Sequence, residues 1–261
     1  MFVIMKISVI TVSYNSAATI ADTVRSVASQ SHTDIEHLVI DGLSIDDTVK
    51  VIEANWHPCL VLSSEPDMGI YDAMNKGLTR ATGEIIGFLN ADDFYADAEV
   101  LARVAQAFES DPCIEACFGD LVYVSEDNRN VVRYWKSRPY TKGGFARGWC
   151  PAHPTFYIRR SALNRLGEFD LNYRLAADAE FMMRYLERGE IQSKYIPHIQ
   201  VRMRLGGATN QSWRNIVRQN HEILQALRKN FIPYSLPSFI LHKFVSRFWQ
   251  RLTAFNILRS K

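Results

Sequence analysis

Two adjacent acids, Asp92 and Asp93, follow the apolar run from Glu84 to Leu89, which is typical of a buried strand. Hard divalent cations such as Mg²⁺ and Mn²⁺ prefer carboxylate oxygens and are commonly shared with the phosphates of a ligand. The same acids could instead cap the helix expected at residues 97–108, because acids are frequent at helix starts. Another acid, Asp41, also follows an apolar run, and this favours a cation site at the strand ends.

Two glycine-rich phosphate-binding loops are missing from the sequence, and this argues against two classes of nucleotide-binding protein. No GxxxxGK[ST] segment occurs, which excludes a P-loop nucleotide hydrolase. Polar Ser13-Tyr14-Asn15 stands after the first apolar run, where a dinucleotide oxidoreductase would carry GxGxxG. A bound nucleotide must therefore rest on polar strand ends, with a metal ion offsetting the charge of its diphosphate.

The elements that would position these residues alternate along the first part of the chain. Apolar, β-branched runs predict strands, and apolar residues at one-turn spacing predict helices. The expected strands are residues 7–12, 37–40, 59–62 and 84–89, and the expected helices begin near residues 20, 44, 70 and 97. This alternation indicates an α/β fold with a mainly parallel sheet, whose ligands bind beyond the carboxyl ends of the strands. Further along, residues 117–136 are expected to be extended, and helices are expected at 177–187 and 212–229.

Four segments in a fixed order resemble the family 2 glycosyltransferases with the GT-A fold, most closely bacterial enzymes of cell-surface polysaccharide and glycolipid synthesis. The segments are residues 7–15, residues 39–42 with Ser44 and Asp46, residues 67–77 (DMGIYDAMNKG) and residues 88–93 (FLNADD). The resemblance covers roughly residues 5–210. It implies a Rossmann-like central sheet flanked by helices, a nucleotide-sugar site on the N-terminal half and an acceptor site on residues 145–210.

The resemblance also implies roles for single residues on the donor side. Its donor-binding positions are Thr11, Ser13, Tyr14, Asp41 and Asp92. Asp41 would accept a hydrogen bond from the ring NH of a uracil-type base, and Asp92 with Asp93 would hold Mn²⁺ or Mg²⁺.

The sequence departs from the family pattern in two places. Asn90 replaces the first acid of the usual D-x-D-D string, which leaves two carboxylates for the metal. An arginine often found in the third segment is absent, and Lys76 and Arg80 are the nearby basic residues that could replace it.

A general base is needed on the acceptor side, because in inverting transfer a carboxylate takes the proton of the attacking hydroxyl. The segment Ala177-Asp178-Ala179-Glu180 resembles the acidic motif that supplies this base at a helix start, which assigns catalysis to Asp178. Capping of the helix at 179–187 is the alternative role for Asp178. Glu180 is expected to support the base or to lie at the surface.

The acceptor side is expected to include Trp149 and His153, which fall where these enzymes line it. Trp149 could stack on a sugar or belong to the core, and His153 could be structural. Gly206-Gly207 resembles a loop that closes over the donor. Arg202 and Arg204 could reach the diphosphate or remain surface charges.

Charge is unevenly divided along the chain. Residues 1–190 carry a net charge of −9, whereas residues 191–261 carry 12 basic residues and one acid, Glu222. An acidic body with a basic tail argues against nucleic-acid binding. The tail also repeats large apolar residues every three to four positions between Phe239 and Phe255, a pattern typical of an amphipathic helix. A membrane surface contacted through residues 237–256 is expected, and packing on the body or on a second copy in a homodimer is the alternative.

These observations predict a catalytic domain at residues 1–211, divided into a nucleotide-sugar half (1–120) and an acceptor half (121–211), and a helical extension at 212–261. The expected activity is metal-dependent, inverting transfer of a sugar from a UDP-, dTDP- or GDP-sugar to a glycan or lipid-linked acceptor. A cytoplasmic location is expected, peripheral on the inner face of the membrane. The alternatives are a sugar-phosphate nucleotidyltransferase and a non-catalytic, membrane-associated subunit of a glycan assembly complex.

Overall fold

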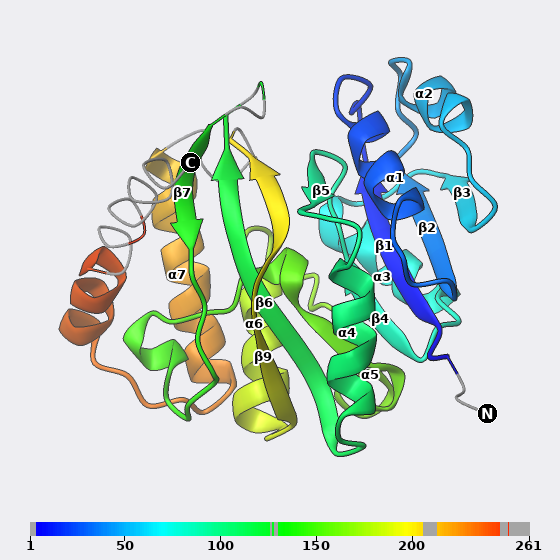
Figure 1. Ribbon diagram of the computed structural model, residues 1–261. Helices are drawn as coiled ribbons and strands as arrows, with labels where there is room; N and C mark the ends of the chain where they lie inside the picture. The colour runs from blue at the N-terminus through cyan, green and yellow to red at the C-terminus, as the bar shows by residue number, and fades with distance from the viewer. Residues whose placement is uncertain (1–3, 126, 128–129, 206–212, 246–249, 251–261) are drawn as a thin grey trace.

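One large sheet with helices on both faces makes up the body of the protein (Figure 1). The computed structural model describes residues 4–125, 127, 130–205, 213–245 and 250. The described strands form a nine-stranded sheet in the order β3-β2-β1-β4-β8-β6-β9-β5, and β7 pairs with β6 outside this path.

The N-terminal part of the sheet is parallel, as the strand–helix alternation predicts. Its strands are β1 (Ile7–Ser13), β2 (Ile35–Asp41), β3 (Leu60–Ser64) and β4 (Ile85–Phe88). The register aligns Ser13 with Asp41 and Asp41 with Ser64, so the carboxyl ends of three strands meet at one edge. Apolar β-branched side chains fill β1 because helices cover both of its faces.

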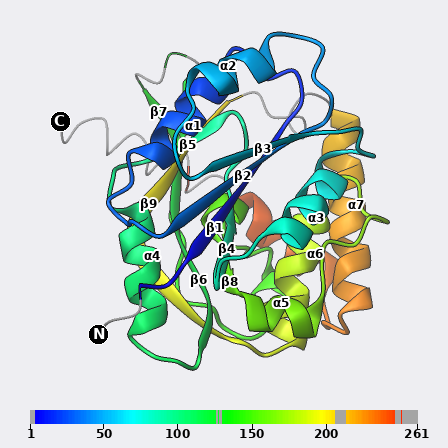
Figure 2. The same cartoon turned by 90° about the vertical axis from the view of Figure 1, so that its right-hand side faces the viewer.

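Helices cover the two faces of the sheet in separate groups (Figure 2). One face carries α1 (Ile20–Ala28), α2 (Thr48–Ala54) and α4 (Val100–Glu109). The other carries α3 (Ile70–Arg80), α5 (Arg160–Leu166), α6 (Ala177–Met183) and α7 (Trp213–Lys229). The helix expected at 177–187 is present as α6 followed by a π-helical turn, Arg184–Arg188. The expected helices are therefore confirmed, with ends displaced by a few residues.

The second half of the sheet is mixed. It contains β5 (Asp93–Tyr95), β6 (Ile114–Val124), β7 (Val131–Trp135), β8 (Tyr157–Arg159) and β9 (Gln192–Arg204). β8 is antiparallel to both β4 and β6 and joins the two halves into one sheet. Residue 120, after which the two halves were predicted to divide, lies in the middle of β6.

Two glycines shape the entry to α3. Gly69 precedes the helix with φ of 117°, a left-handed conformation that L side chains rarely adopt. Gly77 faces β1 so closely that a Cβ there would lie 2.4 Å from Cγ2 of Ile10. These two residues therefore set the start of α3 and its distance from the sheet, and both belong to the DMGIYDAMNKG segment.

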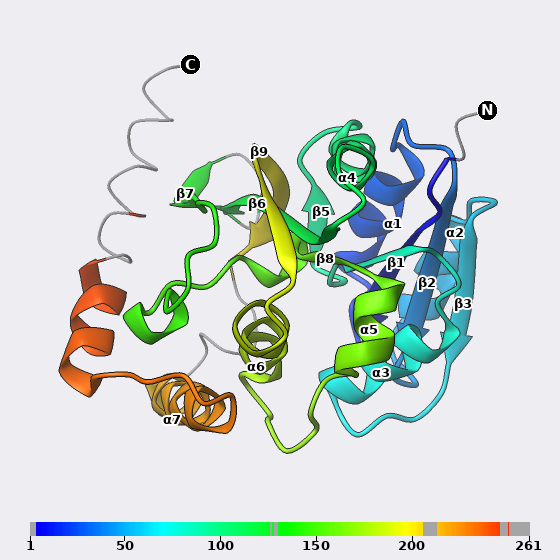
Figure 3. The same ribbon diagram turned by 90° about the horizontal axis from the view of Figure 1, so that it is seen from below.

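The C-terminal helices, which follow the boundary predicted at residue 211, share a core with the body. Ala226, Leu227 and Phe239 are buried in the same core cluster as residues of β1, α3 and α6. Residues 236–245 form a further helix beside α7 (Figure 3), and Phe239 is its buried residue. None of the described helices is long and apolar enough to cross a membrane.

Candidate active site

Asp41 sits at the end of β2 and is completely buried. Its Oδ1 accepts hydrogen bonds from the hydroxyls of Ser13 (3.1 Å) and Ser44 (2.5 Å). Its Oδ2 accepts from the Ser44 amide (3.0 Å) and the Ser64 hydroxyl (2.7 Å). A carboxylate has about four acceptor positions, and these four bonds use them. A nucleobase NH would therefore have to displace one serine hydroxyl in order to bind Asp41.

The other predicted donor-side residues divide into two groups. Tyr14 is 61% exposed, and its ring lies beside Gly42, which also approaches Asp67. Tyr14 is thus available for a ligand at the edge where Ser13 and Asp41 end their strands. Thr11 is not brought to this edge: it is fully buried, and its hydroxyl is 2.9 Å from Nε2 of buried His37. Thr11 therefore lies in the interior, two residues before Ser13 in β1, and not at the edge where the donor site was predicted.

The acid pair lies beyond β4, with Asp93 fully buried at the start of β5 and Asp92 partly exposed. Burial, and next the charge of Asp92, raises the pKa of Asp93 well above its usual range. Burial likewise raises the pKa of Asp92, although Arg204 opposes this. Two carboxyl groups held together in this way favour a positive ligand that would stabilise their charged forms.

Oxygen atoms without partners make the acid pair chemically suited to a hard cation. Oδ1 of Asp93 and Oδ1 of Asn90 are buried and accept no hydrogen bond, and such atoms are uncommon unless a ligand completes them. Within the described part of the chain, no three His, Cys, Asp or Glu side chains are grouped closely enough to bind a metal by themselves. Mg²⁺ is commonly held by one or two carboxylates together with substrate phosphates, so this donor set fits a cation that arrives with a nucleotide.

Asp178 occupies the first turn of α6 and contacts the N-terminal half directly. The hydroxyl of Tyr71, in α3, donates a 3.2 Å hydrogen bond to Oδ1 of Asp178. Burial raises the pKa of Tyr71 well above its usual range, and the charge of Asp178 adds to this, so Tyr71 stays a hydrogen-bond donor. The alternative role of Asp178 as a helix cap is not seen, because the cap position is Ala176 and no side chain caps it.

His153 is buried and shares the electrostatic environment of Asp178. Burial lowers its pKa, while the charge of Asp178 opposes that shift. Its ring stacks on Phe88, the last residue of β4, and its Nε2 has no hydrogen-bond partner. Asp92 and Asp93 follow Phe88 by only a few residues. His153 therefore contacts the segment that leads to the acid pair, and it is also close enough to Asp178 for the charge of that residue to affect its pKa.

Trp149 belongs to an aromatic cluster. Its ring packs edge-on to Phe118 and Phe145, and Arg138 lies 5.5 Å from its centroid. Its indole Nε1 is buried without a partner. These contacts favour the core role for Trp149 over a sugar platform.

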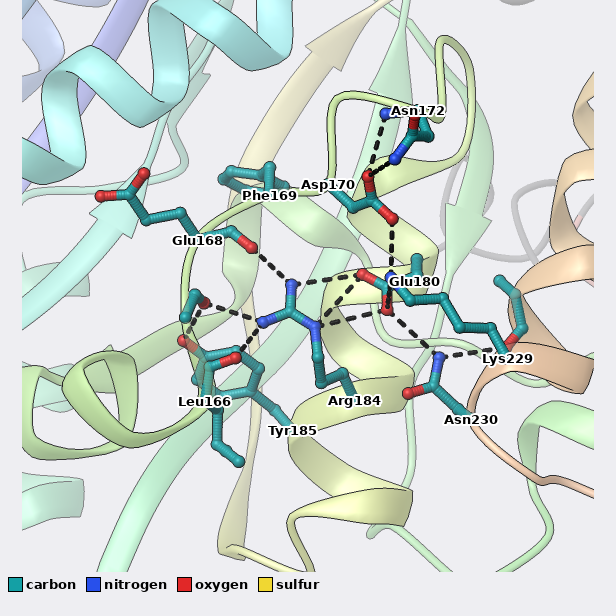
Figure 4. Close-up of polar contacts among 12 residues, drawn as sticks. Leu166, Glu168, Phe169, Asp170, Asn172, Glu180, Arg184, Tyr185, Lys229 and Asn230 are labelled. Atoms are coloured by element: carbon teal, nitrogen blue, oxygen red, sulfur yellow. Dashed lines mark hydrogen bonds and ion pairs between the residues drawn. The ribbon is translucent and has the colours of Figure 1, made fainter.

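Glu180, expected to support the base or to lie at the surface, is completely buried (Figure 4). It forms ion pairs with Arg184 at 3.2 Å and Lys229 at 3.1 Å, and the Asn230 side chain donates to it at 3.3 Å. Arg184 also donates to the carbonyls of Gly167 and Glu168 at 2.9 and 2.5 Å. This network ties α6 to α7 and to the loop before residue 170.

Three of the basic residues considered for the donor side, Lys76, Arg80 and Arg204, form ion pairs with acids of this chain. Lys76 and Arg80 both contact Glu65, at 3.3 and 2.9 Å. Arg204 pairs with Asp22 and donates to the Asp92 carbonyl at 3.1 Å, which places it beside the acid pair. Arg202 lies in β9 opposite Phe94. Gly206-Gly207 lies outside the described residues.

Two residues near Asp178 were given no role from the sequence. Tyr71 lies inside the DMGIYDAMNKG segment, so this motif could have indicated that Tyr71 belongs to the site. Glu222 of α7 accepts hydrogen bonds from the loop just before α6, and its one visible signal is that it is the sole acid after residue 190.

Comparison with known proteins shows which family the chain resembles. The family model "Glycosyl transferase family 2" matches residues 8–167. A PGL/p-HBAD biosynthesis glycosyltransferase of Mycobacterium tuberculosis is 30% identical over 208 residues, 78% of each chain. An uncharacterized glycosyltransferase of the same species is 32% identical over 180 residues, 68% of each chain.

Solved structures show the same fold. Residues 1–349 of Staphylococcus aureus TarS match with a TM-score of 0.68 and 20% identity, over 92% of this chain and 72% of that one. The mannosyltransferase PcManGT from Pyrobaculum calidifontis matches with a TM-score of 0.64 and 22% identity, over 98% and 74% of the two chains. The predicted GT-A fold is thereby confirmed, and the sequence matches show that this chain belongs to glycosyltransferase family 2.

Proposed function

We propose that the protein transfers a sugar, with inversion, from a nucleoside diphosphate donor to a hydroxyl of a glycan or lipid-linked acceptor. The observation that supports this most is the placement of Asp178 at the start of α6. Tyr71 reaches its carboxylate from the N-terminal half, and buried His153 lies in its field. A carboxylate placed between the two halves of a glycosyltransferase is suited to take a proton from an acceptor.

The donor would bind at the carboxyl edge of β1 and β2, with Ser13, Tyr14 and Asp41 around its base. Solved structures of TarS contain UDP or UDP-GlcNAc, and that of PcManGT contains GDP-Man and Mn²⁺. A UDP-, dTDP- or GDP-sugar is accordingly the donor class proposed here. Asp92 and Asp93 would hold Mn²⁺ or Mg²⁺, which when bound offsets the negative charge that builds on the departing diphosphate.

In the proposed reaction, the acceptor oxygen forms a bond to the anomeric carbon while the bond from that carbon to the diphosphate oxygen breaks. Asp178 takes the proton of the acceptor hydroxyl, and the nucleoside diphosphate leaves with the bonding electron pair. Nε2 of neutral His153 has no partner in the protein. It can therefore form one hydrogen bond with the acceptor and orient the acceptor hydroxyl.

Binding of nucleotides tests the donor site independently of the acceptor. Thermal unfolding is measured with UDP, GDP, dTDP and CDP, each with and without Mn²⁺. We expect one nucleotide to raise the melting temperature only when Mn²⁺ is present, and Asp93→Asn to remove that effect. Stabilisation that does not need Mn²⁺ would contradict the metal role, and no stabilisation by any of the four at millimolar concentration would contradict the donor site.

The base is tested by separating turnover from binding. Asp178→Asn keeps the size and the hydrogen bond from Tyr71 but cannot accept a proton, so we expect sugar transfer to fall by about 10²-fold or more. Nucleotide stabilisation should be retained. Equal loss of both would contradict the role of Asp178 as the base.

A membrane surface is proposed as the place of the acceptor. In the helix at residues 236–245, Ile240, Leu241 and Phe244 are 58%, 61% and 73% exposed, whereas Phe239 anchors the helix to the core. Seven basic residues and no acid follow Glu222 in the sequence. Exposed apolar side chains within a basic segment suit the interface of an anionic bilayer.

A further inference from the structure

Glu222 is a buried acid in α7 whose carboxylate points at the start of α6. It is 5% exposed. Its Oε2 accepts hydrogen bonds from three successive backbone amides: Arg174 at 3.0 Å, Leu175 at 2.7 Å and Ala176 at 3.1 Å. One oxygen of the single acid in the basic C-terminal segment thus binds one short stretch of the main chain.

The three amides belong to the segment that leads directly into Asp178. Ala176 is the cap residue of α6, and Arg174 and Leu175 come just before it, so Glu222 binds the last main-chain amides before the helix begins. A carboxylate at a helix N-terminus is also favoured by the helix dipole. Glu222 therefore supplies, from a different helix, a negative acceptor for the main chain that leads into α6.

Glu222 is not needed to attach α7 to α6. The two helices are already joined by Lys229 and Asn230 through buried Glu180, and the core contacts of Ala226 and Leu227 add to this attachment. The second oxygen of Glu222 meets Arg218 at 3.2 Å, a side chain that is 54% exposed. The contact that distinguishes Glu222 is therefore the one to residues 174–176.

The charges of Glu222 and of Asp178, the proposed base, both act on Tyr71. Burial raises the pKa of Tyr71 most, the charge of Asp178 comes next, and the charge of Glu222 contributes as well. Both acids therefore act on the same hydroxyl. Asp178 accepts a hydrogen bond from that hydroxyl, and the residues just before its helix donate their amides to Glu222.

We infer that Glu222 is a positioning residue for catalysis: by binding the amides of residues 174–176 it fixes the start of α6 and thereby the place of the Asp178 carboxylate. This rests on the proposed role of Asp178 as the base. A base displaced by about 1 Å can lose about 10²-fold in rate while the ligand still binds, so the expected effect falls on turnover rather than on donor affinity.

The test uses the full chain with three variants. Glu222→Ala removes the acceptor, Glu222→Gln keeps an acceptor oxygen without the charge, and Arg218→Ala removes the partner of the other oxygen as a matched control. Hydrogen exchange reports on the amides of residues 174–176. Donor binding is measured as Mn²⁺-dependent stabilisation by UDP, GDP, dTDP or CDP, and turnover as nucleoside diphosphate release from a panel of UDP-, dTDP- and GDP-sugars.

We expect Glu222→Ala to speed exchange of these amides and to lower kcat by about 10- to 100-fold, with donor KM and nucleotide binding unchanged. Glu222→Gln should recover part of kcat, and Arg218→Ala should match the unmodified protein. Unchanged exchange and kcat in Glu222→Ala would overturn the inference. So would a loss of nucleotide binding that parallels the loss of kcat, because that is the result of general unfolding.

Asp178→Asn separates failure of the inference from failure of the proposed function. If Asp178→Asn is inactive while Glu222→Ala is fully active, the positioning role alone is wrong. If Asp178→Asn keeps full turnover, the base is not Asp178, and both statements are wrong.

Discussion

The hydroxyl of Tyr71 and the carboxylate of Asp178 meet at 3.2 Å although the two residues are 107 positions apart. This hydrogen bond joins α3 of the donor half to α6 of the acceptor half. We expect Tyr71→Phe to lower kcat by about tenfold, because the carboxylate loses a charged hydrogen bond that holds its orientation. The phenyl ring should keep its stacking on Phe169, so nucleotide binding should not change. Steady-state kinetics and thermal shift measure the two effects.

A double-mutant cycle shows whether Tyr71 acts through Asp178. In an Asp178→Asn background, Tyr71→Phe should have little further effect on kcat. Tyr134→Phe is a matched control, because it removes a tyrosine hydroxyl that donates to Asp120, away from the proposed base. Independent, multiplicative losses in the double variant would show that Tyr71 does not work through Asp178.

His37 makes stability depend on pH. Burial, and next the charge of His57, lowers its pKa from 6.5 to about 3. Between these two values the unfolded chain binds a proton that the folded chain does not. Stability is therefore complete above pH 6.5 and is lost as the pH falls, by up to about 1.4 kcal/mol per pH unit from this residue. Urea unfolding of the protein and of His37→Gln between pH 7.5 and 5 measures the difference.

Thr11→Val is the control for that measurement. It removes one of the two hydrogen-bond partners of His37, leaves His57 as the other and keeps the buried imidazole, so the steep pH dependence should remain. The explanation fails if His37→Gln shows the same pH dependence as the unmodified protein.

Arg184 compensates the buried charge of Glu180 and also serves the carbonyls before residue 170. We expect Arg184→Ala to cost about 3 kcal/mol of unfolding free energy, because a buried carboxylate loses its main partner while Lys229 remains. Arg188→Ala, an exposed change on the same helical segment, should stay within about 0.5 kcal/mol. Denaturant unfolding would refute this role for Arg184 if the two variants were equally stable.

Exposed Phe244 gives a direct measure of membrane contact. We expect Phe244→Ser to weaken binding to phosphatidylglycerol-containing vesicles by about tenfold, because burying one such side chain is worth about 1.5–3 kcal/mol. Vesicle co-sedimentation measures this, and vesicles of pure phosphatidylcholine should bind less of either protein. Trp56→Ser is the matched control: Trp56 is 58% exposed and comes just after α2, a helix on the other side of the molecule from residues 236–245 (Figure 1). Equal binding by all three proteins would argue for packing against protein instead.

Much of the fold could be predicted from local patterns, because apolar periodicity and strand-end acids are properties of short segments. β1 to β4 and the helices between them follow those patterns, and Asp178 was found through a motif. Contacts between distant segments leave no such pattern. The three-residue strand β8 was not predicted, because its pairing with β4 and β6 is set by tertiary packing. For the same reason Glu222 could be noted as an isolated acid but not assigned to the amides before α6.

β8 also has a consequence for protein engineering. It comes from the second half of the sequence but lies between β4 and β6, so the sheet has no seam at which donor and acceptor halves could be exchanged between relatives. A chimera cut near residue 120 would divide β6 and pair β4 of one parent with β8 of the other. Changes of donor or acceptor preference should therefore be sought by grafting loops at the strand ends onto the intact sheet.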